Sequence, residues 1–236
     1  GLWVLIFSVI FTFPFMYYII KIEEKTDEKV EGAFKVWEAH KDALFAFMWL
    51  FLGFLVALSF WHMTLGNPEL LNFQIETYCG INNPRNVEGC VERYTSGVEI
   101  TGNVTKIGRF LSILTNNVYV MIFTLLFSLV FGAGAIFILM WNASVIAAAI
   151  GIFAEQSVRN IPLGLGRYMI HGFPEIGAYF ITALAGGMFG VGALRHGFKS
   201  KKFLRVFENT ILLLFLSLII LIIAGIIEVY ITPGLF

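Results

Sequence analysis

Five ionisable side chains lie inside stretches of this sequence that are otherwise apolar, and they are the residues best able to do chemistry. They are His62, Glu155, His171, Glu175 and Glu228. An ionisable group inside a membrane span is costly, so each of the five is a candidate for a functional role.

His171 and Glu175 are four residues apart and share one face if a single helix runs through both. Gly172 and Pro174 lie between them, and Pro is typical of the first helical turn. A second interpretation therefore starts the helix near Phe173 and leaves His171 at its mouth. Either arrangement keeps the imidazole within about one turn of the carboxylate.

Three kinds of chemistry are open to this group. With Glu228, the His171–Glu175 pair has the ligand types for Zn²⁺ or another divalent ion, and an open coordination position would permit hydrolysis with Glu155 as a base. The same side chains suit a proton relay or a cation site in a transporter. The third interpretation is a structural polar cluster, in which neighbouring amides hold the spans together. The candidate amides are Asn116, Asn117 and Asn142. The HExxH pattern of zinc hydrolases is missing, so no catalytic residue is assigned.

Composition identifies the solvent of the elements that must position these residues. The 236-residue chain is 58% hydrophobic and 14% charged, with a mean hydropathy of +0.82. This is too apolar for a water-soluble core alone, so we predict an all-α, polytopic transmembrane bundle in contact with the lipid bilayer. Sixteen basic residues balance sixteen acidic ones, which gives no indication of nucleic-acid binding.

The apolar stretches predict about six spans in a single transmembrane domain, residues 1–236. Five are long enough to cross directly, and a sixth stretch, 143–154, suits a short or re-entrant element. The five long stretches are 2–20, 43–65, 118–141, 168–194 and 210–230. Small residues such as Gly186 and Gly190 in the fifth span indicate close packing inside the bundle rather than a dimer interface, although a homo-oligomer stays open.

Charge in the connecting segments predicts the orientation. Segment 195–205 is rich in Lys and Arg, and segment 21–42 carries five lysines, so both are expected at the cytoplasmic face. These two assignments agree only if the short element crosses the membrane, which places both termini outside. The five ionisable candidates then all lie toward the extracytoplasmic side.

Two connecting segments have features of their own. Segment 21–42 is interpreted as a cytoplasmic interfacial helix, or as a solvated helix that continues into the second span. Segment 66–116 is expected to be an extracytoplasmic loop. Its cysteines, Cys79 and Cys90, are eleven residues apart and predict a disulfide in an oxidising compartment.

The order of the polar residues resembles one family of membrane proteins. Asn116-Asn117, Asn142, the element His171-Gly-Phe-Pro-Glu175, a Gly/Ala-rich run and Glu228 follow one another as in the stage II sporulation protein M family. The resemblance covers about residues 110–233. It implies a multi-span helical protein without a settled enzymatic activity, whose sporulation members work as membrane partners of cell-wall hydrolases.

The leading hypothesis is therefore an integral protein of the cell membrane that acts by assembly with membrane or envelope partners. The alternative is an intramembrane metal-dependent hydrolase that uses His171, Glu175 and Glu228. A transporter of ions or small solutes is the third hypothesis.

Overall fold

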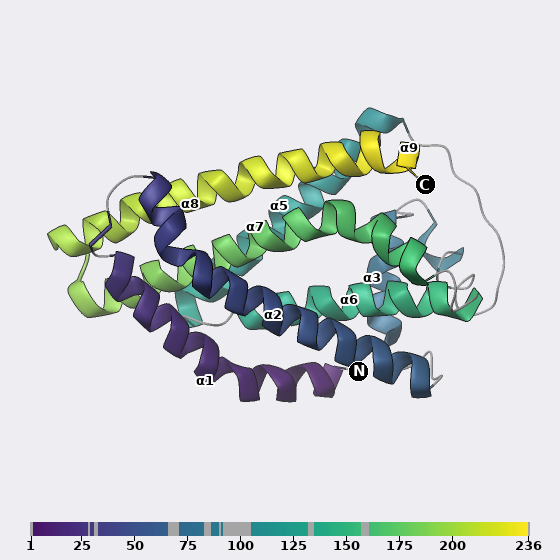
Figure 1. Cartoon of the computed structure of the whole chain (residues 1–236), viewed down its shortest axis with the longest axis horizontal. Helices are drawn as coiled ribbons and strands as arrows, with labels where there is room; N and C mark the ends of the chain where they lie inside the picture. The colour runs from purple at the N-terminus through teal and green to yellow at the C-terminus, as the bar shows by residue number, and fades with distance from the viewer. Residues whose placement is uncertain are drawn as a thin grey trace.

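The computed structural model is a bundle of helices, which confirms the predicted fold class. It describes residues 2–27, 29–30, 33–65, 71–82, 86–89, 91, 105–131, 135–156 and 161–235, and it contains no strand in these ranges. The helices are α1 (Leu2–Asp27), α2 (Ala33–Leu65), α3 (Asn72–Asn82), α5 (Lys106–Phe131), α6 (Ala135–Gln156), α7 (Ile161–His196), α8 (Lys201–Ile226) and α9 (Thr232–Leu235), with a π-helical turn at Ile227–Ile231 between the last two (Figure 1).

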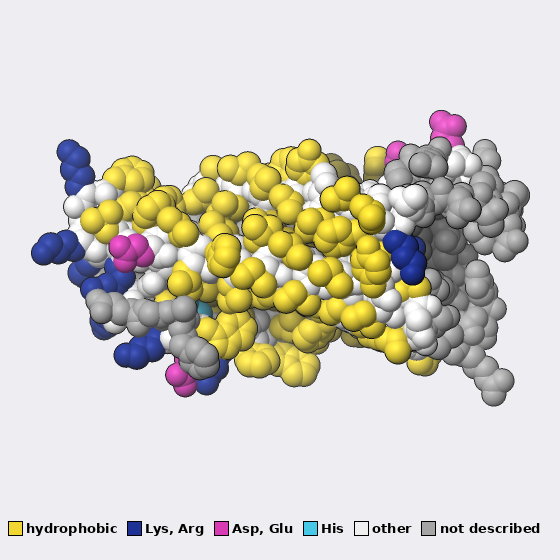
Figure 2. All heavy atoms as spheres, turned by 90° about the horizontal axis from the view of Figure 1, so that it is seen from above, with side chains coloured by type: hydrophobic (Ala, Val, Ile, Leu, Met, Phe, Trp, Pro, Cys, Tyr) yellow, Lys and Arg dark blue, Asp and Glu magenta, His cyan; other side chains and the backbone are white. Residues whose placement is uncertain are grey.

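Five helices in the described part of the chain are long and apolar enough to cross a membrane: α1, α2, α5, α7 and α8. In α6 the apolar part, Ala135–Gly151, is shorter. Apolar side chains cover the flank of the bundle, and most of the visible Lys and Arg side chains gather at the end where α7 meets α8 (Figure 2). The chain is therefore a multi-pass membrane protein.

The short helix α6 runs lengthwise along the bundle, antiparallel to α5 and α7 (Figure 1). The end of α1 consequently lies beside the end of α7, where Glu24 pairs with Arg195. The two basic segments thus share one end of the molecule, which we call the basic end.

The helix α7 is the centre of the bundle. In its most apolar stretch 83% of the residues are buried, against 17–33% for the other four long helices. Small residues allow this close approach. A Cβ atom at Gly186 would lie 2.8 Å from the Ser128 Cβ of α5, and one at Gly190 would lie 2.7 Å from the Leu129 carbonyl oxygen. These two glycines therefore serve packing inside the bundle.

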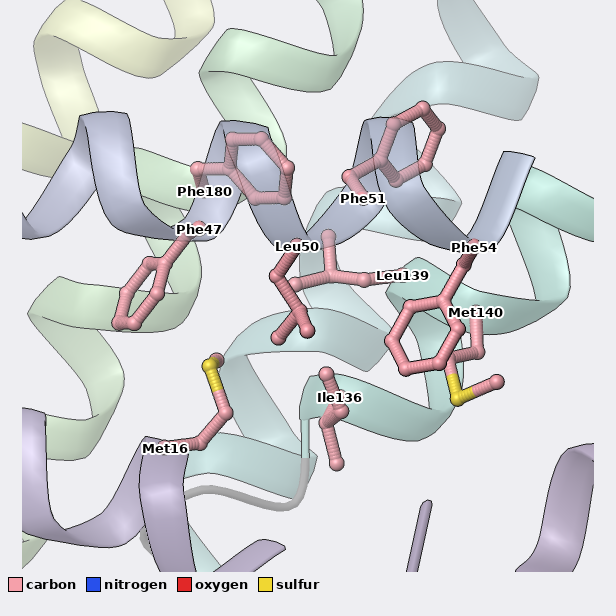
Figure 3. A pocket seen from close by; sticks show the side chains of 9 residues that line it. All are labelled: Met16, Phe47, Leu50, Phe51, Phe54, Ile136, Leu139, Met140 and Phe180. Carbon is pink, nitrogen blue, oxygen red and sulfur yellow. The ribbon is translucent and has the colours of Figure 1, made fainter. Parts of the chain in front are cut away.

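An aromatic cluster fills the space between α1, α2, α6 and α7 (Figure 3). The Phe180 ring of α7 meets Phe47 and Phe51 of α2 edge-on, with centroids 6.3 and 5.8 Å apart. Met16 and Met140 close the cluster, which leaves a cavity of only about 10 Å³. The tight packing fits the preference of aromatic pairs for edge-to-face contact.

Several predicted boundaries are wrong, and each has a physical reason. The third span was expected at 118–141, but α5 ends at Phe131 and α6 begins at Ala135, so Asn142 lies inside α6. Hydropathy does not mark a junction that has apolar sequence on both sides. The helix α7 begins at Ile161 and continues through Pro174. Membrane helices tolerate such a residue because neighbouring groups satisfy the freed backbone carbonyl.

Both connecting segments contain helical residues. Segment 21–42 is divided between the end of α1 and the start of α2, and α2 continues into the second span. Segment 66–116 contains the helix α3 and the first turns of α5. On α3, Ile75 and Cys79 are buried against Ala148 and Ala149 of α6. A polar helix of only 11 residues gives little sequence signal.

Candidate functional site

Six of the predicted polar residues line one cavity of about 120 Å³ at the end of the bundle opposite the basic end. They are Asn116 and Asn117 of α5, Asn142 of α6, His171 and Glu175 of α7, and Glu228 of the π-helical turn. A cavity of this size and polarity has room for several water molecules. We call it the polar cavity.

The continuous course of α7 places His171 and Glu175 on the same face. The strongest contact in the polar cavity joins α7 to α5, because the Asn117 amide donates a hydrogen bond of 2.6 Å to Glu175 Oε1. Asn116 lies beside this pair, with its amide nitrogen 3.4 Å from Asn117 Oδ1.

Glu228 lies on the only π-helical turn in the described part of the chain, and such turns are frequent at functional sites. One of its carboxylate oxygens is 4.0 Å from His171 Nε2, and the other is 3.9 Å from the Arg109 guanidinium. Arg109 is half exposed, so solvent weakens this pairing. The two carboxylates of the cavity therefore have different partners. Glu175 accepts a hydrogen bond from a neutral amide, whereas Glu228 lies near two basic side chains without a short hydrogen bond to either.

Of the other two ionisable candidates, His62 is not among the described residues that line the polar cavity. His62 is buried on α2 and packs against α6, where a Cβ atom at Gly151 would overlap its ring. Glu155 belongs to α6, but its side chain lies outside the described part of the structure.

A bound metal stays a prediction, and the described part of the structure gives it no support. Among the described residues, no three His, Cys, Asp or Glu side chains come close enough together to hold a metal ion. His171, Glu175 and Glu228 line the same cavity, but the carboxylate of Glu175 is bonded to Asn117.

The predicted disulfide is not tested by the described residues. Cys79 is fully buried on α3, whereas Cys90 lies outside the described residues. The pairing of Cys79 with Cys90 stays a prediction.

A second polar site, at the basic end, was missed in the sequence. His40 of α2 is fully buried between two carboxylates of α1: Nδ1 is 2.6 Å from Glu23 Oε2, and Nε2 is 3.0 Å from Asp27 Oδ1. Ionised carboxylates only accept hydrogen bonds. Each of the two contacts therefore needs its own proton, whereas a neutral imidazole carries only one. The group of His40, Glu23 and Asp27 thus holds one proton more than a neutral imidazole with two ionised carboxylates. The Asn209 amide of α8 also donates to Asp27, at 3.0 Å.

The neighbouring acid, Glu24, joins α1 to the end of α7. Its fully buried carboxylate pairs with the Arg195 guanidinium and lies 3.1 Å from His196 Nε2. Together with His40 and its partners these residues form what we call the basic-end network, which connects α1, α2, α7 and α8.

The sequence did contain a signal for the basic-end network. The buried face of α1 includes Met16, Ile20, Glu24 and Asp27, which follow at intervals of four, four and three residues. The apolar stripe that faces the bundle thus continues into the acids without changing face. The overall charge of segment 21–42 does not reveal this register, because the buried acids are averaged with the exposed ones.

Fold and site together define a class: a multi-pass helical membrane protein whose shielded central helix carries polar side chains near both ends. The chain belongs to the stage II sporulation protein M family, whose model matches residues 4–233. The match is longer than the resemblance over 110–233 and includes the basic-end network.

One relative is an uncharacterized protein of Methanocaldococcus jannaschii. It is 35% identical over 130 residues, which cover 53% of this chain and 71% of the relative. No solved structure matches the chain.

Proposed function

We propose that the chain is a protein of the cell membrane that works by assembly with membrane or envelope partners. The hydrogen bond between Asn117 and Glu175 carries this proposal. It fixes α5 against the central helix, and α5 follows directly on segment 66–105. The contact of α3 with α6 anchors the same segment at an earlier point. The polar cavity thus holds the helices that present this segment to partners.

The proposed orientation places the basic end in the cytoplasm. Lys and Arg gather there (Figure 2), and the positive-inside rule favours that face for them. Both termini, segment 66–116 and the polar cavity then face the extracytoplasmic side. A disulfide between Cys79 and Cys90 suits that compartment.

A crosslinking experiment tests the partner function. A photo-crosslinking residue at Phe73, which is exposed on α3, is expected to capture a defined set of envelope proteins in intact cells. The same residue at Lys201, exposed at the basic end, is expected to give a different set. The Phe73 set is expected to be lost in Glu175→Leu, which leaves the Asn117 amide without its acceptor, and kept in Glu208→Leu, a matched change of an exposed acid on α8. An unchanged set in Glu175→Leu would contradict the proposal.

The polar cavity favours one second candidate, the transport of a small cation. Its two carboxylates, Glu175 and Glu228, face a space large enough for a partly hydrated ion. Flux of Na⁺, K⁺ or methylammonium into proteoliposomes that Glu175→Gln abolishes would support this candidate. Equal flux into protein-free liposomes would refute it.

A further inference from the structure

An apolar groove of about 430 Å³ lies on the flank of the bundle, along α7 between α2 and α8. One wall is a single face of α2, formed by Trp37, Lys41, Leu44, Phe45 and Met48. These positions follow the helical repeat, so they line the groove along about 16 Å of α2. The volume is within the range of small-molecule sites, about 300–1,000 Å³.

The groove exists because α7 carries small residues where it forms the floor. Gly177 has no side chain, and nothing lies within 4 Å of the place where its Cβ would be. One turn earlier, Pro174 also lines the floor and presents a compact ring without an N–H group. Ile220 of α8 closes the far wall.

The groove has a polar group at one end only. Lys41 is the single charged residue among the described residues that line it, and Trp37 lies one turn closer to the basic end on the same face of α2. Trp side chains prefer the membrane interface, and Lys extends its ammonium group from an apolar wall toward head groups. Two acids lie near Lys41 in the sequence, Glu38 three residues before it and Asp42 directly after it, and neither is among the residues that line the groove.

We propose that the groove binds one acyl chain of a phospholipid with an anionic head group, whose phosphate lies at Lys41. The charge at the rim complements the phosphate, and the body of the groove complements a hydrocarbon chain. Such a lipid is distinct from the exchanging lipid around the bundle, because residues of three helices line the groove that holds its chain. It also contacts the turns of α7, at Phe173 and Gly177, that carry His171 and Glu175 on another face. Occupancy of the groove therefore supports the helix that positions the polar cavity.

Native mass spectrometry of the purified protein tests the proposal. The probes are phosphatidylglycerol and phosphatidylcholine with identical acyl chains. Wild-type protein is expected to retain one phosphatidylglycerol and to prefer it over phosphatidylcholine. Gly177→Leu fills the floor and is expected to lower occupancy at least tenfold. The matched change Gly53→Leu, at an exposed site on α2 outside the groove that is equally free of neighbours, is expected to have no effect.

The head-group contact is tested separately. Lys41→Gln is expected to reduce the preference for phosphatidylglycerol about fivefold, since a basic residue near an anionic surface contributes about 1 kcal/mol. Lys35→Gln, an exposed lysine on another face of α2, is expected to keep the preference. Equal retention of the two lipids by wild-type protein would overturn the assignment of an anionic head group.

A photoactivatable phosphatidylglycerol with its reactive group on the acyl chain gives a test that needs no variant. Its expected crosslinks in wild-type protein are to Phe45 and Met48. Crosslinks spread evenly over the lipid-facing helices would overturn the groove as the site. In the mass-spectrometry experiment, lipid occupancy of Gly177→Leu equal to that of the wild type would do the same.

Discussion

Replacing Gly190 with alanine tests whether the central position of α7 depends on close backbone contact. The added Cβ would lie 2.7 Å from the Leu129 carbonyl oxygen and 3.4 Å from its carbonyl carbon. Because both are backbone atoms of α5, no rotamer change relieves the overlap, and the two helices must move apart by several tenths of an ångström. The matched change is Gly53→Ala on α2, where nothing lies within 4 Å of the added atom.

Both changes increase the helix propensity of the chain, but only Gly190→Ala introduces an overlap with a neighbouring helix. Alanine is favoured over glycine inside a helix by about 1 kcal/mol, so Gly53→Ala is expected to be neutral or slightly stabilising. Overpacking costs about 1–3 kcal/mol, so Gly190→Ala is expected to be less stable than Gly53→Ala by that amount. Thermal unfolding in one detergent, followed by tryptophan fluorescence, measures the difference. Equal midpoints for the two variants would refute the argument that backbone contact positions α7.

Two further substitutions test the polar groups, and a third experiment tests the disulfide. Glu24→Gln removes the buried negative charge that pairs with Arg195 at the end of α7, and it is expected to lower the free energy of unfolding by about 3 kcal/mol. Glu38→Gln changes an exposed acid at the same end and is expected to have little effect. Equal thermal midpoints for the two variants would contradict the buried ion pair. Asn117→Ala removes the amide donor to the carboxylate in the polar cavity and is expected to cost about 1–3 kcal/mol, so a variant of wild-type stability would count against this contact. Peptide mapping without reduction is expected to recover a peptide that joins Cys79 to Cys90, and two free thiols in freshly purified protein would disprove the pairing.

Hydropathy predicted the existence of the helices because lipid and water are very different solvents for a side chain. It did not locate their ends where the sequence stays apolar, as between Phe131 and Ala135. Pro174 left two starts open for the helix that carries His171 and Glu175, and the structure shows the continuous one, because the surrounding bundle compensates for the one backbone hydrogen bond that a proline interrupts.

The residues of the polar cavity could be predicted for the same reason. An Asn, His or Glu inside an apolar stretch has no water to bind, so it must find a polar partner within the protein. The sequence alone could not decide which partner it finds, because this depends on the register between helices. Glu175 meets Asn117, and His62 packs on α6 away from the polar cavity.

The central helix connects the two polar sites physically. Because α7 is shielded from lipid, its polar side chains are bonded to neighbouring helices, Glu175 to α5 and Arg195 to α1. A shift of α7 along its axis by one turn, about 5.4 Å, would break both contacts at once. Gly186 and Gly190 hold α7 in close contact with α5 between the two sites. Any conformational change that preserves the two sites must therefore move α7 together with α1 and α5 as one unit.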